Sequence, residues 1–321
     1  MKRSVSILLV NIIVLIHINA QDPEITHYMY NYMAINPGFA GSEEELYLTV
    51  INRKDFITFG NSPMMYAFNV NTPFKFLNNY HGVGLSFEMQ RYPFNNDFNL
   101  DLSYAYKLYT ESGKFSFGIN IGLFNNNYSN PQWLDPSGGT GDSDPLIPKG
   151  SGSIEPNKTS FDIGAGFLYK NDNLYMGISG QHLNSPKMSN SENIANNNNN
   201  GKLSPSFYIF SGYNISLSNP LFVAKPSVLM HIHGSMMALN LTGLVEYNKR
   251  LWGGVSYRTG SAFSALLGIE LINGLRMALA YDIGTNKLMS YGKGSYEIIV
   301  NYRVNLKVDR KVQRYKSIRF L

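Results

Sequence analysis

The chain has 321 residues, of which 44% are hydrophobic and 13% aromatic, while charged residues make up only 15%, well below the roughly 25% of soluble domains. The absence of cysteine excludes disulfides, thiol catalysis and a lipid-modified N-terminal cysteine. The net charge of +5 lies at the ends: residues 1–20 carry +2 and residues 303–321 carry +6, which leaves about −3 between them and excludes a generally basic nucleic-acid binder.

The first 20 residues have the pattern of a secretory signal peptide. Lys2 and Arg3 precede an apolar run that extends from Val5 to Ile18, and the small residue Ala20 precedes Gln21. The run is shorter than the roughly 20 residues that a membrane-spanning helix needs. We therefore expect a signal peptide over 1–20, cleaved so that the mature chain starts at Gln21.

Residues 21–44 are apolar but follow neither a helical nor a strand period. Tyrosine and methionine crowd between His27 and Met33, and Asn36-Pro37-Gly38 follows. A residue before proline favours extended geometry, and a Pro-Gly pair turns the chain. Exposure of so many aromatic side chains would disfavour solubility. We therefore expect an N-terminal plug and docking segment that packs in the periplasmic mouth of a larger structure.

This segment also resembles the start of the PorP/SprF family, whose pattern is roughly QDP-x-x-[ST]-Q-Y-x-x-N-x-x-x-x-N-P-[AG]-[YF]-A-G. The residues that carry the resemblance are Gln21-Asp22-Pro23, His27-Tyr28, Asn31 and Asn36-Pro37-Gly38-Phe39-Ala40-Gly41-Ser42. His27 stands where the family usually has Gln, and Gly38 where it usually has Ala. The resemblance implies an outer-membrane β-barrel tied to the type IX secretion system and gliding machinery of Bacteroidetes. On this basis the candidate docking residues are Tyr28, Asn31, Asn36, Pro37, Gly38, Phe39 and Gly41.

From residue 45 to residue 304, apolar and polar residues alternate in segment after segment. In 97–108, the even-numbered positions from Phe98 to Leu108 are apolar, whereas the other face carries Asp97, Asn99 and Asp101. The segments 114–124 and 296–304 alternate in the same way, with Ile299 as an exception. This period of two is typical of strands with one apolar face.

Two architectures explain many such strands, a soluble β-sandwich and a transmembrane β-barrel. The segments have about 9–11 residues, which suits a tilted strand that crosses the hydrocarbon layer. Charged residues and glycines on the polar faces suit a barrel lumen, and aromatic residues recur near strand ends, where membrane interfaces favour them. These features favour an all-β fold, a transmembrane antiparallel barrel of about 14 strands.

Each predicted strand is identified by its central residue. These residues are Leu48, Phe68, Leu85, Leu102, Ile119, Ala165, Ile178, Ile209, Val228, Leu241, Val255, Leu267, Leu279 and Val300. An even number places both termini on one side of the membrane, the periplasm. The two longest connections, 125–159 and 184–203, then both face the cell exterior.

The last residues, 305–321, form a basic tail with no further strand to pair with. A solvated tail and a periplasmic contact with an acidic or protein partner both explain its composition. For the second alternative, the candidate contact residues are Arg310, Lys311 and Arg314.

We find little support for catalysis. The chain has no Gly-x-Ser-x-Gly elbow, HExxH motif or phosphate-binding loop, so we expect no enzyme, no catalytic residue and no cofactor. His231 and His233 share a strand face but lack an evident third metal ligand, and Asp142 and Asp144 fit a solvated acidic loop better than a calcium site. We therefore expect no metal site.

Together, these features predict an outer-membrane barrel that acts by binding. The resemblance implies that it assists the export or surface attachment of cargo proteins with a type IX sorting domain, including gliding adhesins, and that it contacts periplasmic ring components of the secretion apparatus. Its other partner is outer-membrane lipid, and nucleic acid is excluded. The alternative is an outer-membrane channel or hydrophobic-ligand transporter.

Overall fold

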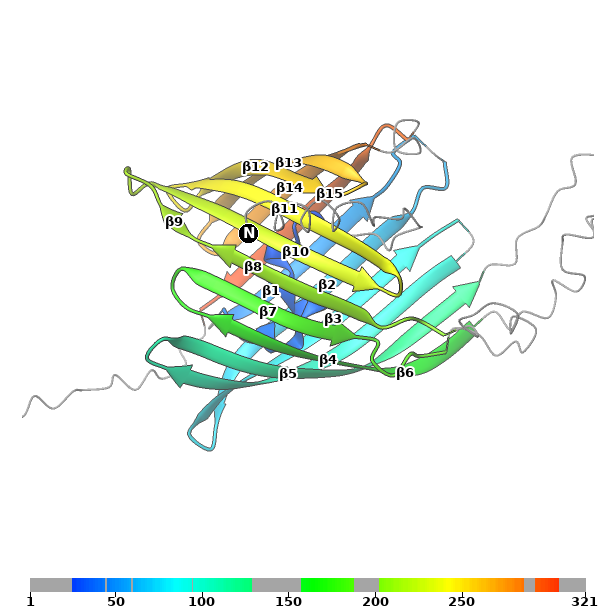
Figure 1. The fold of residues 1–321 in the computed structure, drawn as a ribbon, viewed down its shortest axis with the longest axis horizontal. Coiled ribbons are helices and arrows are strands. Elements are labelled where there is room, and N and C mark those ends of the chain that lie inside the picture. Colours follow the sequence, from blue (N-terminus) through cyan, green and yellow to red (C-terminus); the bar gives the residue numbers. More distant parts are fainter. Residues whose placement is uncertain are drawn as a thin grey trace, which may run out of the picture.

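The computed structural model describes residues 25–43, 45–58, 60–93, 95–128, 157–187, 202–285 and 292–305, which form one closed antiparallel β-barrel with a short segment inside it (Figure 1). The predicted signal peptide, the start of the mature chain and the basic tail with Arg310, Lys311 and Arg314 lie outside the described residues, as do Asp142 and Asp144.

The described elements are three single helical turns followed by strands. The turns are η1 (Tyr28–Tyr30), α2 (Tyr32–Ile35) and η2 (Pro37–Phe39). The strands are β1 (Leu46–Lys54), β2 (Met64–Phe76), β3 (Asn79–Arg91), β4 (Asn95–Thr110), β5 (Gly113–Tyr128), β6 (Asn157–Lys170), β7 (Leu174–Gln181), β8 (Ser206–Tyr213), β9 (Ile215–Ser216), β10 (Phe222–His233), β11 (Met236–Tyr247), β12 (Leu251–Arg258), β13 (Ala262–Ile272), β14 (Leu275–Gly284) and β15 (Ser295–Val304).

The barrel closes where the last strand pairs with the first. β15 and β1 are antiparallel neighbours from Leu46 opposite Val304 to Lys54 opposite Tyr296. The strands β8 and the two-residue β9 both pair with β10, so they share one place in the wall. The wall described by the structure therefore has 14 strand positions, as the sequence predicts, and closure leaves no exposed sheet edge.

Side chains alternate between the lumen and the outer surface along each strand. On β4, Asp101 and Ser103 are buried whereas Leu102 and Tyr104 are exposed, which confirms the predicted faces. Ile299, the exception in the pattern, faces inward and is buried. It belongs to an apolar cluster in the lumen, so a polar residue is not needed at this position.

The two ends of the barrel differ in their connections. At one end, which we call the turn mouth, the strands are joined by residues 77–78, 111–112, 171–173, 248–250 and 273–274. At the other end, the loop mouth, the connections 129–156 and 182–205 are much longer. Both long connections thus leave from the same end, as predicted, because the strands before them have the same direction.

The lumen contains two apolar clusters on opposite walls. One joins the side chains Ala105, Leu168, Phe210 and Leu229 of β4, β6, β8 and β10 with the segment inside the barrel. The other is formed by β1, β2 and β11–β15 and also contacts this segment. Among the described residues, no helix is both long enough and apolar enough to cross a membrane. The core therefore lies inside the barrel, around residues 25–43.

Candidate functional site

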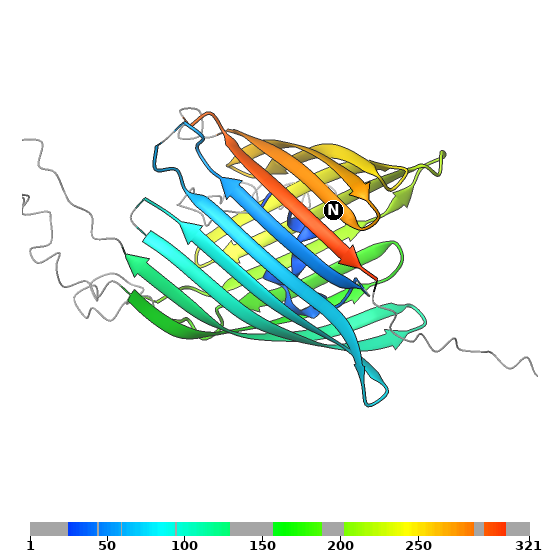
Figure 2. The same ribbon diagram turned by 180° about the vertical axis from the view of Figure 1, so that it is seen from behind.

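Residues 25–43, which we call the lumen segment, lie inside the barrel in both ribbon views, where they are drawn in dark blue (Figures 1 and 2). The backbone follows the expected local geometry. Asn36 precedes proline and is extended, with φ −144° and ψ 108°, and its side chain accepts a hydrogen bond of 2.8 Å from the Gly38 N–H. Because the helical turns are only three or four residues long, contacts with the barrel wall must hold the segment.

Glycines in the wall allow the segment to approach closely. A Cβ atom at Gly118 of β5 would collide with the backbone of Pro37 and Gly38, and one at Gly82 of β3 would collide with the carbonyl of Ala40. Gly41 itself has φ +63°, a conformation that favours glycine, and a Cβ there would lie 2.7 Å from the backbone of β2. Glycine at positions 82 and 118 of the wall and at position 41 of the segment therefore allows the two backbones to pack closely.

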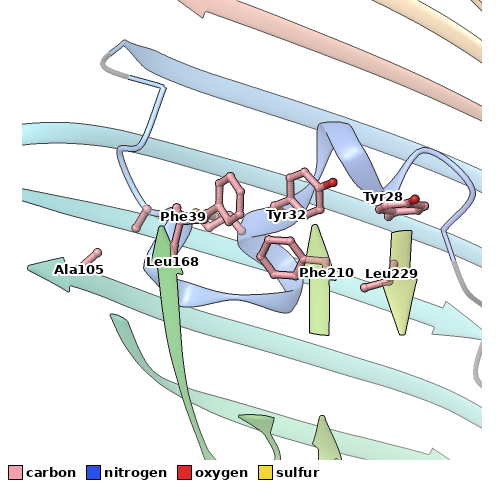
Figure 3. Close-up of a cluster of buried hydrophobic side chains, with 9 residues drawn as sticks. Tyr28, Tyr32, Phe39, Ala105, Leu168, Phe210 and Leu229 are labelled. Carbon is pink, nitrogen blue, oxygen red and sulfur yellow. The ribbon is translucent and has the colours of Figure 1, made fainter. Parts of the chain in front are cut away.

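An aromatic stack anchors the middle of the segment (Figure 3). The ring of Tyr32 lies between those of Phe39 and Phe210, with centroid distances of 4.6 and 4.7 Å. The Tyr32 hydroxyl donates a hydrogen bond of 3.0 Å to the hydroxyl of Tyr175, and the ring of Tyr28 lies edge-on at 6.0 Å. Since fully burying one large apolar side chain contributes about 1.5–3 kcal/mol, these rings hold the segment firmly.

Side-chain amides fix the segment at three further places. The Asn36 amide donates to the carbonyl oxygens of Phe167 at 3.0 Å and Ile178 at 3.3 Å. The Asn69 amide of β2 donates to the side-chain oxygen of Asn31 at 2.6 Å. The Gly41 N–H donates to the side-chain oxygen of Asn71 at 2.9 Å. Each bond joins the segment to a strand far away in sequence.

A buried charged cluster holds the first described residues of the segment. The backbone N–H groups of Thr26 and His27 donate to the Glu297 carboxylate at 2.7 and 2.8 Å, and the His27 ring lies 2.8 Å from the same carboxylate. The Arg53 guanidinium contacts Glu297 at 3.4 Å and Asp282 at 2.7 Å. Both carboxylates are almost inaccessible to solvent. Hydrogen bonds and opposite charge together compensate their burial.

The segment extends through the lumen from one half of the barrel to the other. Arg53 is the last but one residue of β1, so His27 and Thr26 lie toward the loop mouth. At the opposite end, the Lys107 ammonium donates to the carbonyl of Gly41, and Lys170, the last residue of β6, pairs with Glu43 at 2.8 Å. The Lys170 ammonium lowers the pKa of the Glu43 carboxyl. The segment thus extends along the lumen toward both mouths, whereas the sequence predicts a position at the periplasmic mouth alone.

The predicted docking residues of the segment are brought together by this path. Tyr28, Asn31, Asn36, Pro37, Gly38 and Phe39 are all buried in the lumen, and Gly41 lies near the turn mouth. The sequence reasoning missed Thr26, Arg53 and Glu297. Arg53 and Glu297 gave only the signal of a charge on the inward face of a strand, and the strand register is needed to show that the two charges meet.

The histidine pair shows no metal-binding arrangement. The His231 ring stacks on Tyr208 with centroids 4.4 Å apart, and His233 lies 2.6 Å from the hydroxyl of Ser206. Across the described ranges, no group of three or more His, Cys, Asp or Glu side chains could hold a metal ion.

Comparisons with known proteins identify a family and a fold. A family model described as "Type IX secretion system membrane protein PorP/SprF" matches residues 18–302. No curated protein gives a significant match.

Among solved structures, a deletion mutant of the monoaromatic hydrocarbon channel TodX matches with 13% identity and a TM-score of 0.50, covering 85% of this chain and 94% of that chain. The outer membrane protein Omp33 of Acinetobacter baumannii matches with 7% identity and a TM-score of 0.46, covering 81% of this chain and 99% of that chain. The toluene transporter TbuX of Ralstonia pickettii matches with 11% identity and a TM-score of 0.47, covering 85% of this chain and 93% of that chain. At such identities, the TodX match shows a likeness of fold alone.

Proposed function

The chain belongs to the PorP/SprF family of type IX secretion system membrane proteins, and we propose that it is a non-enzymatic outer-membrane barrel that assists the export or surface attachment of specific cargo proteins. The proposed cargo carries a type IX sorting domain, and gliding adhesins are one class of it. The proposed periplasmic partners are ring components of the same apparatus.

The observation that carries this proposal is the occupied lumen. The lumen segment contacts both apolar clusters on opposite walls and is held by a charged cluster toward one mouth and by lysines at the other. A barrel that transports a solute as large as a hydrocarbon needs a continuous wide path through its lumen, whereas a barrel that binds partners needs ordered surfaces at its mouths. The packing of this lumen supports the second role.

We place the turn mouth in the periplasm and the long connections at the cell exterior. Both termini of the barrel, Leu46 and Val304, lie at the turn mouth, where the lumen segment also ends. Glu43, the exposed end of the lumen segment, forms the proposed docking surface for the secretion apparatus together with the neighbouring turns. The basic tail follows Val304 in the sequence, and Arg310, Lys311 and Arg314 are the residues that we propose to contact an acidic partner.

The alternative function, a channel or hydrophobic-ligand transporter, agrees with the likeness of fold to a hydrocarbon channel but has no further support. That likeness does not assign a ligand. The residues that would line a transport path instead pack against the chain's own N-terminal segment.

Deleting residues 22–32 tests the proposal. The deletion removes the rings of Tyr28 and Tyr32 and the contacts with Glu297 but leaves every wall strand in place. We expect a folded barrel in the outer membrane, loss of the cargo from the cell surface and loss of copurification with ring components. The control variant Tyr32→Phe keeps the ring stack and loses one hydroxyl, so it should retain both properties. Normal cargo display by the deletion variant, at wild-type barrel levels, would refute a role of residues 22–32 in secretion.

A further inference from the structure

Two cavities with mixed polar and apolar linings lie beside the lumen segment, one toward each mouth. The turn-side cavity, of about 40 Å³, is lined by Asn31, Asn69 and Asn71 together with aromatic and methionine side chains of the segment, and it extends to Glu43 at the turn mouth. The loop-side cavity, of about 120 Å³, is lined by Asn31, Glu88, Asp101 and His182 among others. Because a water molecule takes up roughly 30 Å³, these spaces hold about one and about four waters respectively.

Asn31 is the residue that the two cavities share, since it lines both. Its side-chain oxygen accepts the bond from Asn69, whose own oxygen accepts one from Ser86. This chain of bonds crosses the space between the segment and β2–β3. Asn31 is only 4% exposed, and its amide nitrogen has no acceptor in the protein. A buried donor of this kind is normally satisfied by water, so both cavities are hydrated at their junction.

The charges along the loop-side cavity have one sign. Glu88 and Asp101 line it, and neither lysine nor arginine does so among the described residues. His182, which also lines it, pairs with Asp162 at 2.7 Å. In the turn-side cavity, the charge of Glu43 is offset by Lys170. Carboxylates that line a narrow water-filled passage attract cations and repel anions, so the loop-side cavity favours cations over anions.

From these observations we infer that the barrel contains a narrow cation pathway alongside the lumen segment, and that the Asn31–Asn69 contact closes it. This inference goes beyond the proposed function. The permeant species are monovalent cations that have lost most of their hydration shell, because the turn-side cavity has room for about one water, which excludes a folded peptide or an aromatic ligand from the pathway. Each cavity reaches a residue that is partly open to its own mouth, His182 at 20% and Glu43 at 37% side-chain exposure.

The experiment is a planar-bilayer recording of the purified full chain under a KCl gradient. The wild-type barrel should conduct weakly. Asn31→Ala should join the cavities, raise the single-channel conductance and move the reversal potential toward the potassium equilibrium potential. Adding Glu88→Gln and Asp101→Asn should abolish that shift while the conductance persists. Thr49→Ala serves as the control, because this residue lines only the turn-side cavity. It should stay at the wild-type conductance.

Asn69→Ala provides an independent test, since it removes the other half of the contact and should act in the same way. Heat-modifiable migration on gels verifies that each variant is a folded barrel. Folded Asn31→Ala and Asn69→Ala proteins that conduct no better than wild type would overturn the inference, as would an open state that prefers chloride. Cargo display is measured separately, so a failure here leaves the proposed secretion role unaffected.

Discussion

Arg53 is the single residue on which most of the charged cluster depends. Its guanidinium contacts the carboxylates of Asp55, Asp282 and Glu297, at 2.8, 2.7 and 3.4 Å. Two of these acids are almost fully buried, and Arg258 is farther from Asp282, at 3.9 Å. Removing one partner of a buried ion pair is costly because the remaining charge stays in a poorly solvated site.

Arg53→Met should therefore destabilise the barrel by about 3–5 kcal/mol, the range for breaking a buried pair. The measurement is a urea titration of the heat-modifiable band. Arg91→Met, at an exposed end of β3, is the matched control and should change little. Adding Glu297→Gln to Arg53→Met should recover part of the loss. An Arg53→Met protein as stable as wild type would mean that the cluster does not hold the segment.

The sequence indicated the individual charges but not their partnership. Asp282 alternates with apolar residues in its strand, so its inward position could be predicted. Its contact with Arg53 could not, because it depends on closure between β1 and β15 and on the register of β14. His27 stood out only as a departure from a family pattern, whereas in the barrel its ring and backbone both contact Glu297.

At the scale of elements, the strands were predictable and the path of the lumen segment was not. All 14 predicted centres fall within the long wall strands, because alternation in a strand reflects a simple division between lumen and outer surface. The segment has no period, and its burial depends on side chains from many distant strands. The Asn36-Pro37-Gly38 turn was recognisable, but the extension of the segment toward the loop mouth required the positions of Arg53 and Glu297.

The two faces of β4 give a direct test of the strand assignment. Leu102 is half exposed on the outer face, so Leu102→Arg places a charge against lipid and should cost about 2–4 kcal/mol near the membrane midplane. Asn99 faces inward and donates to Asp101 at 2.6 Å, so Asn99→Arg places its charge among carboxylates and should cost less. Urea titration of folding in lipid vesicles measures both. Equal losses would show that the faces are wrongly assigned.

At the scale of the whole molecule, the inner surface of the closed barrel is complementary to the segment that occupies its lumen. The wall provides an apolar outer surface, and its inward glycines and amides accommodate the N-terminal segment. This arrangement separates the two mouths, and each can present its own surface, long connections at one end and the exit of the lumen segment at the other. The proposed secretion role uses both surfaces, and the proposed cation pathway follows the remaining space between segment and wall.

A designed disulfide tests most directly whether the segment lies in the lumen. The chain has no cysteine, so an introduced pair reports on one contact alone. A Cβ atom at Gly38 would lie 3.4 Å from the Cβ of Leu168 on β6, close to the range of about 3.5–4.5 Å seen in disulfides. The matched control replaces Phe167, the neighbouring residue on the opposite face of the same strand.

Gly38→Cys with Leu168→Cys should form a reducible cross-link in intact outer membranes, seen as a shift in mobility on non-reducing gels of the unfolded protein. Gly38→Cys with Phe167→Cys should form none, because its second thiol faces lipid. The absence of a cross-link in the first pair, or equal cross-linking in both, would contradict the account that residues 25–43 occupy the barrel lumen.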